Sequence, residues 1–200
     1  MSSAVGPTAS DPLASALHDG ADRIVVLLLA VDRGSSGASV VIDGRSGAGK
    51  STLASLVRVA LVSRGRDVSL VRLDDLYPGW DGLAAGAALA DESVLRPHRD
   101  GEAATWHRYD WGADAYAEGH TIAPSDIVIV EGAGALTPAS AGSADVRVWV
   151  EAPDVARRER ALARDGETYR PHWDRWADQE RLHIVEHRPR ELADLIINVP

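Results

Sequence analysis

Short apolar runs alternate with amphipathic stretches along most of the chain. Five of these runs are rich in β-branched and aliphatic residues, and we predict strands at Ser39–Asp43, Val68–Leu73, Asp126–Val130, Val146–Val150 and Leu195–Val199. They are continuously apolar rather than alternating, which is typical of parallel strands covered on both faces. Helices are predicted between them at Lys50–Ser63, Asp154–Asp165 and Trp173–Glu186. This order predicts a doubly wound α/β fold with a five-stranded parallel sheet and right-handed crossovers.

A further apolar run, Ile24–Val31, precedes the first predicted strand. Its eight residues are far fewer than the roughly 20 that span a bilayer, so it does not predict a membrane anchor. The acidic residues before it and the lack of a basic segment argue against a secretion signal. We predict a buried helix that begins at Asp11-Pro12 or at Asp22 and ends near Gly34.

The chain is predicted to form one domain over residues 11–200. Residues 1–10 are small and polar and are expected to be disordered, and residues 34–39 are expected to form a flexible connection.

The interval from Asp74 to Ser125 is much longer than a usual crossover connection. It follows the carboxyl end of a predicted strand, where open α/β sheets bind their ligands, so we interpret residues 74–125 as a substrate-binding insertion. The alternative is a helical subdomain whose tryptophans form its core, and we expect both to hold for different tryptophans. The aromatic and basic residues of the interval are Tyr77, Trp80, Arg96, His98, Arg99, Trp106, His107, Arg108, Tyr109, Trp111 and Tyr116.

The composition narrows the classes of partner. The net charge of −9 and the acidic isoelectric point make the surface repel nucleic acid and anionic membranes, so any anionic ligand needs a local positive site. The chain has no cysteine, which excludes disulfides, thiolate catalysis and cysteine-bound zinc and favours a reducing compartment. We therefore expect a cytoplasmic protein without nucleic-acid or membrane partners, and a homodimer is left open.

The segment GRSGAGKS, residues 44–51, matches the phosphate-binding pattern G-x-x-x-x-G-K-[ST] of P-loop NTPases. A predicted strand leads into it and a predicted helix leaves it, as the pattern requires. Lys50 is the only lysine in the chain, and its compact ammonium fits a closed loop that a planar guanidinium would not. We expect ATP to be bound by Gly44, Arg45, Ser46, Gly47, Ala48, Gly49, Lys50, Ser51 and Thr52.

Two acidic positions follow the neighbouring predicted strands. Asp74 comes after the second strand and Glu131 after the third, and parallel strands bring both to the sheet edge that carries the phosphate loop. With Ser51 they are candidate ligands of Mg²⁺, because phosphoryl transfer needs a cation to offset charge. The alternatives are a helix cap at Asp74-Asp75 and a turn at Glu131-Gly132.

Several segments together resemble the uridine kinase, phosphoribulokinase and pantothenate kinase group of P-loop kinases. They are GRSGAGKS, LDDLY, RYDW, IVIVEGAGAL, VEAPDVARRERALARD and ADLIINV, so the resemblance runs from about Ser39 to the last residues. It implies that Asp74 is the catalytic carboxylate, that Tyr109-Asp110-Trp111 lines the acceptor site, and that Arg157, Arg160, Arg164 and Asp165 belong to a lid helix. Arg108 stands next to Tyr109 where the group has proline, so the resemblance supports kinase chemistry more than nucleoside specificity.

The lid arginines also have a reading from spacing alone. Arg157, Arg160 and Arg164 are three and four residues apart and lie on one helical face. They form either a solvated face paired with Glu159 and Asp165, or a lid over residues 157–175 that covers the transferred phosphate. His183 and His187 are one helical turn apart and are read as surface histidines, because no carboxylate completes a metal site.

The sequence therefore predicts an ATP- and Mg²⁺-dependent small-molecule kinase acting on a nucleoside-like hydroxyl. The expected catalytic residues are Lys50, Asp74, Arg160 and Arg164, the metal ligands Ser51, Asp74 and Glu131, and the acceptor residues Asp74, Tyr77, Trp80, Arg108, Tyr109, Trp111 and Glu131. One alternative is a nucleoside monophosphate kinase, which needs Arg96, Arg99 and Arg108 to converge. The other is a regulatory ATP-binding protein or ATPase, whereas a Ras-like GTPase is excluded because the lone lysine lies in the phosphate loop.

Overall fold

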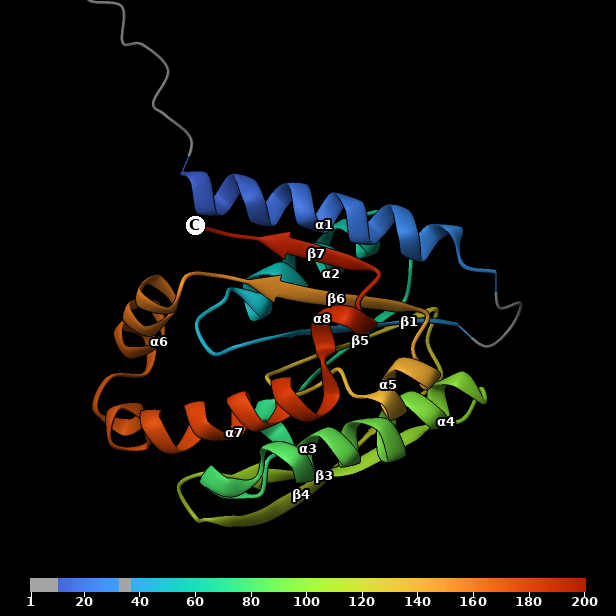
Figure 1. Ribbon diagram of the computed structural model, residues 1–200. Helices are drawn as coiled ribbons and strands as arrows, with labels where there is room; N and C mark the ends of the chain where they lie inside the picture. The colour runs from blue at the N-terminus through green and yellow to red at the C-terminus, as the bar shows by residue number, and fades with distance from the viewer. Residues whose placement is uncertain (1–10, 33–36) are drawn as a thin grey trace, which may run out of the picture.

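The computed structural model describes residues 11–32 and 37–200 and contains a central parallel sheet (Figure 1). Residues 1–10 and residues 34–36 of the predicted flexible connection lie outside the described residues, and the last two residues of that connection belong to β1. The five strands are ordered β2-β5-β1-β6-β7, and all four pairings are parallel. This confirms the predicted fold class and its five strands, which are β1 Ala38–Gly44, β2 Val68–Arg72, β5 Ile127–Glu131, β6 Val146–Glu151 and β7 Leu195–Asn198.

The sheet is covered on both faces, which explains why its strands read as unbroken apolar runs. All seven residues of the central strand β1 are buried. Val40 and Ile42 belong to one hydrophobic cluster and Val41 to the other, as the two-residue repeat of a strand requires.

The helices divide between the two faces of the sheet (Figure 1). One cluster packs β1 against α1 Pro12–Ala30 and α2 Lys50–Val62, and the other packs it against side chains of α3, α6 and α7. Helix α6 crosses the edge where the strands end. The remaining helices are α3 Leu83–Ala90, α4 Arg96–Arg99, α5 Pro138–Ser143, α6 Asp154–Tyr169, α7 Trp173–His187 and α8 Pro189–Leu192.

Helix α1 begins at the first of its two predicted starts and ends at Ala30, before the predicted end near Gly34. The side chain of Asp11 accepts a hydrogen bond from the backbone N–H of Leu13 at 3.0 Å, and Pro12 occupies the first turn, where a missing N–H costs nothing. Its buried face lies against α2 and β7, and Gly20 lets the helix approach Ile197 closely. No helix in the two described ranges is both long and apolar enough to cross a membrane.

The insertion after β2 is only partly helical. It contains α3, a π-helical turn at Asp91–Leu95 and α4, and then the antiparallel hairpin of β3 Ala104–Asp110 and β4 Ala115–Ile122. The alternative reading of the insertion as a helical subdomain is therefore wrong for the hairpin. Both strands carry many exposed polar residues, so they lack the apolar runs that identified the other five strands.

Helix α6 extends past its predicted end at Asp165. Gly166 adopts φ 57° and ψ −133°, which kinks the helix and changes the direction of the segment that leads into α7. The helix predicted over Asp154–Asp165 is thus interrupted one residue after its predicted end, and helical structure resumes after the kink.

We predict that Ile24→Ala lowers the free energy of unfolding by about 2 to 5 kcal/mol, because Ile24 is fully buried in the cluster beneath α1. Urea denaturation measures this. The matched control Val26→Ala lies on the exposed face of the same helix and should change stability by no more than about 0.5 kcal/mol. Equal losses in both variants would mean that α1 is not packed as described.

Candidate functional site

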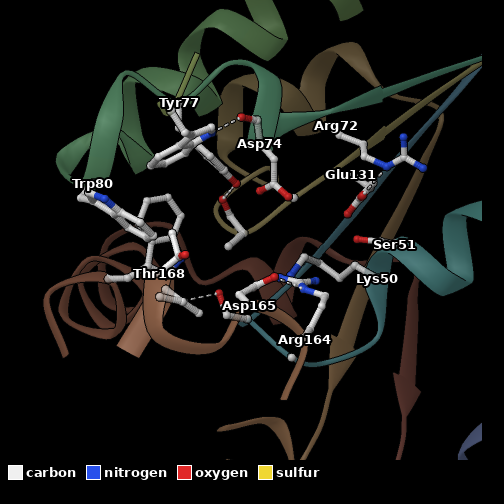
Figure 2. Close-up of a pocket in the computed structure, with 17 residues that line it drawn as sticks. Lys50, Ser51, Arg72, Asp74, Tyr77, Trp80, Glu131, Arg164, Asp165 and Thr168 are labelled. Atoms are coloured by element: carbon white, nitrogen blue, oxygen red, sulfur yellow. Dashed lines mark hydrogen bonds and ion pairs between the residues drawn. The ribbon is translucent and has the colours of Figure 1, made fainter. Parts of the chain in front are cut away.

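A cavity of about 580 Å³ opens at the edge where β1, β2 and β5 end (Figure 2). The phosphate loop forms its floor, the residues after β2 and β5 form one side, and the last part of α6 forms the other. Ten predicted site residues line it together, namely Ser46, Gly47, Lys50, Ser51, Asp74, Tyr77, Trp80, Trp111, Glu131 and Arg164.

The phosphate loop connects β1 to α2 through backbone conformations that only glycine adopts easily. Gly49 caps α2 with φ 100°, and Gly47 has φ 78°. A Cβ atom on Gly47 would lie 1.9 Å from the carbonyl oxygen of Arg157, so this position also needs glycine for its contact with α6. Lys50 is mostly buried, and its Nζ donates to the carbonyl of Arg45 at 3.2 Å across the loop. The ammonium is thereby held inside the ring of loop atoms.

The lid segment lies directly against the loop. Arg160 Nε donates to the carbonyl of Gly47 at 2.8 Å, and the hydroxyl of Tyr169 donates to Ser46 Oγ at 3.0 Å. Arg160 Nη1 also donates to the carbonyl of Pro200 at 2.7 Å, and Arg160 does not line the cavity, whereas Arg164 does. The structure thus separates the two predicted lid arginines, with Arg160 beside the loop and Arg164 facing the cavity.

The two predicted carboxylates meet above Lys50 and Ser51 (Figure 2). Glu131 is buried, and burial raises its pKa, while the charge of Lys50 and a hydrogen bond from Ser51 oppose the rise. Asp74 is open to solvent on the cavity side, yet protein atoms crowd its carboxylate. This desolvation raises the pKa of Asp74, while Lys50 and Arg164 oppose the rise.

The residues fit a hydrated magnesium ion shared with phosphates. Glu131 Oε1 is buried without a hydrogen-bond partner, although Arg72 Nε lies 3.6 Å away. The described residues hold no cluster of three or more His, Cys, Asp or Glu that could bind a metal by themselves. A cation here would take few protein oxygens, from Ser51, Glu131 and Asp74, and complete its shell with phosphate and water, as Mg²⁺ does in such sites.

Aromatic side chains form the wall opposite the loop. Trp80 stacks on His172 with ring centres 4.2 Å apart and lies 4.8 Å from Trp111. Trp111 Nε1 donates to the carbonyl of Asp74 at 2.8 Å, so the hairpin is tied to the carboxylate segment. Tyr77 is buried, and its hydroxyl donates to the carbonyl of Ala133 at 2.7 Å. The wall joins the insertion to the lid.

Some predicted site residues lie elsewhere. Arg108 pairs with Glu118 and Asp110 on the hairpin. The ring of Tyr109 packs edge-on against Trp111, and its hydroxyl donates to Asp114 Oδ1 at 2.6 Å. Neither lines the cavity. Thr52 is exposed on α2. Four other predicted loop residues, Gly44, Arg45, Ala48 and Gly49, shape the loop without lining the cavity.

Sequence reasoning did not assign Ala133 or five further lining residues to the site. Arg72 ends β2, Thr168 and Tyr169 belong to the lid after the Gly166 kink, Trp176 lies on α7, and Gly132 follows Glu131. Arg72 could have been found from the sequence, because Asp74, two residues later, was identified from its position at the end of the same strand.

His183 is not a surface residue, and the prediction is wrong for it. Its ring is buried, and Nε2 lies 2.9 Å from Asp43 Oδ2. Asp43 ends the apolar part of β1 and also accepts from the backbone N–H groups of Gly44, Gly134 and Leu136. The pair joins α7 to the strand that carries the phosphate loop, and an aspartate inside an apolar strand was the signal for a buried partner.

Comparison with known proteins agrees with this geometry. Two solved structures share this fold. A possible uridine kinase from Bacillus stearothermophilus shares 19% identity and a TM-score of 0.67, covering 90% of this chain and 98% of its own. A candidate fructose transport system kinase from Silicibacter sp. TM1040 shares 20% identity and a TM-score of 0.65, with the same coverage. No protein-family model and no curated protein matches the chain.

We predict that Asp74→Asn raises the melting temperature at pH 7. A carboxyl with a higher pKa in the folded state binds its proton more tightly there, so its ionisation at neutral pH opposes folding. The gain should shrink as the pH falls toward the ordinary pKa of 3.8, where the wild-type carboxyl is itself protonated. Thermal melts across this range test it. The control Asp75→Asn, which does not line the cavity, should show a smaller gain, and a loss of stability in Asp74→Asn at pH 7 would contradict the prediction.

Proposed function

We propose that the protein is a kinase that transfers the γ-phosphate of MgATP to a hydroxyl of a ring-containing, nucleoside-like metabolite. The observation that carries this proposal is that Lys50, Ser51, Asp74 and Glu131 line one cavity whose opposite wall is aromatic. The names of the two structural neighbours support a kinase. We expect it to act in the cytoplasm, without nucleic-acid or membrane partners.

The loop and Lys50 would bind the polyphosphate. Backbone N–H groups at the start of α2 point along the helix axis, and the helix dipole favours negative charge there. Lys50 adds a full charge that is already held in place, so little reorganisation is needed when phosphate enters. Magnesium held by Ser51 and the two carboxylates would supply charge neutralisation of the phosphates.

Asp74 is the proposed proton acceptor for the attacking hydroxyl. Burial raises the pKa of Asp74, which makes it a stronger base than an ordinary aspartate, while the charges of Lys50 and Arg164 oppose the rise. Arg164 lines the same cavity and would stabilise charge on the transferred group. The reaction then depends on positioning and electrostatics, with no covalent enzyme intermediate.

The aromatic wall favours a neutral ring on the acceptor. Trp80 and Trp111 offer apolar surface next to Asp74, which suits a base or another flat ring. The arginines that a monophosphate acceptor would need do not converge, since Arg96 pairs with Asp91, Arg99 with Asp100 and Arg108 with Glu118. This geometry argues against a nucleoside monophosphate kinase. The aromatic wall beside Asp74 offers a surface on which an acceptor molecule can bind, and this argues against a regulatory ATPase.

We predict that Asp74→Asn lowers turnover by about 10² or more while MgADP affinity stays near the wild-type value, because asparagine keeps the shape and loses the base. Isothermal titration calorimetry gives the affinity. Turnover is measured as phosphate transfer from ATP to a panel of nucleosides, nucleoside monophosphates, sugars and pantothenate-like alcohols. An equal loss of binding and turnover would show that Asp74 is structural, and transfer to monophosphates alone would exclude its role toward a hydroxyl.

Lys50→Ala should abolish turnover and weaken MgADP binding while the fold is retained, since Lys50 contributes one hydrogen bond to the loop. Circular dichroism checks the fold. A thermal-shift screen of the wild type with MgADP and the acceptor panel identifies the acceptor, because a ligand bound to the folded state raises its melting temperature. No shift with MgADP at millimolar concentration would reject the proposed function.

A further inference from the structure

Two consecutive residues of α7 hold the two halves of the cavity. Glu180 accepts from the backbone N–H of Ser46 at 2.6 Å and from Arg45 Nε at 3.1 Å, both in the phosphate loop. Gln179 Nε2 donates to the carbonyl of Trp80 at 2.7 Å, and its Oε1 accepts from the N–H of Leu83 at 3.3 Å. Glu180 therefore contacts the phosphate loop, and Gln179 contacts the aromatic wall.

The carboxylate of Glu180 is so deeply buried that other groups must offset the loss of its hydration. Its side chain is 3% exposed, and removing a carboxylate from water costs several kcal/mol unless it is paired and hydrogen-bonded. Arg45 supplies one partner and Arg157 Nη1, 3.7 Å away, another. Both oxygens of Glu180 are thus engaged by the loop or by cations that flank it.

The contact fixes the first half of the loop. Glu180 accepts a hydrogen bond from the Ser46 N–H, so its carboxylate sets the path of the backbone between β1 and Gly47. Of the loop residues that follow, Gly47, Lys50 and Ser51 line the cavity. A loop whose amides are already oriented binds an anion without first losing conformational freedom.

We propose that Glu180 is a positioning residue of the phosphate loop, and that Glu180 and Gln179 together set the distance between the polyphosphate site and the acceptor wall. This inference rests on the proposed binding of MgATP. It assigns to α7 a role that lies outside the sequence motif, and Glu180 touches neither substrate nor the reacting atoms.

Charge and positioning predict opposite effects for the loss of Glu180. A negative charge beside the loop repels phosphate, so removing it would tighten binding if repulsion dominated. The two flanking arginines offset that charge at 3.1 and 3.7 Å, which leaves positioning as the larger effect. The sign of the change in affinity therefore separates the two roles.

The test is calorimetric titration of MgADP into the wild type and four variants. Glu180→Ala should weaken binding by roughly tenfold, the loss expected for a hydrogen bond to a charged group. Glu180→Gln retains an acceptor for the Ser46 N–H and should stay within about threefold of wild type. Glu180→Asp keeps the charge but is one methylene shorter, so it should weaken binding nearly as much as alanine. Glu186→Ala, at an exposed position on the same helix, should leave the affinity unchanged.

Hydrogen exchange provides the second readout. Glu180→Ala should speed exchange of the Ser46 amide and leave the Leu83 amide protected, whereas Gln179→Ala should speed exchange at Leu83 and leave Ser46 protected. A residue that only stabilises the fold would change exchange throughout the domain.

The outcomes separate this inference from the proposed function. A wild-type protein that fails to bind MgADP would reject the proposed function. Normal or tighter binding by Glu180→Ala, in a protein whose wild type binds MgADP, would overturn only the positioning role. If the alanine variant does not fold, Glu180→Asp and Glu180→Gln decide the question, and wild-type affinity in both would overturn it.

Discussion

The parallel pairing of β2, β5 and β1 is the constraint on which the site depends. Glu131 is paired with Arg72 on one side and with Ile42 on the other, so the ends of all three strands lie at one level of the sheet. Gly44 then begins the phosphate loop two residues beyond Ile42, and Asp74 follows two residues beyond Arg72. A register slip of one residue would turn Glu131 to the other face of the sheet and separate the carboxylates from Lys50.

The segment from α6 to α7 also helps to hold the phosphate loop in its conformation. Its groups contact the loop from outside: Arg160 at the Gly47 carbonyl, Tyr169 at the Ser46 hydroxyl and Glu180 at the Ser46 amide. The side chain of Trp80 then joins the same segment to the insertion by stacking on His172. The phosphate loop and the aromatic wall of the cavity are in this way held by one continuous stretch of chain, and Gly47 must lack a side chain for that stretch to approach.

The sequence was sufficient for the sheet, the loop and the two carboxylates because each depends on a local pattern. An apolar run predicts a buried strand, and the end of a parallel strand predicts where Asp74 and Glu131 lie. The hairpin β3–β4 could not be predicted in this way, since its partly exposed strands carry Thr105, His107 and Glu118 where an apolar residue would have marked a core strand.

The long-range partners were beyond pattern reasoning for a different reason. His183 reads as an ordinary helical histidine until Asp43, 140 positions earlier, is placed beside it. Likewise, the helical spacing of Arg160 and Arg164 puts them on one face. It does not predict that Arg160 would donate to the Gly47 carbonyl while Arg164 lines the cavity. Such choices are made by tertiary packing, and the Gly166 kink changes the direction of the chain just where the spacing argument ends.

The packing of Gly20 against Ile197 joins the first described helix to the last strand of the sheet. During synthesis α1 leaves the ribosome long before β7 exists, so its apolar face has no complete surface to cover. Closing a loop of this length is entropically costly and slow relative to local contacts. That layer of the domain is therefore completed only after β7 has been synthesised, and until then the part of α1 that packs against Ile197 stays exposed to solvent.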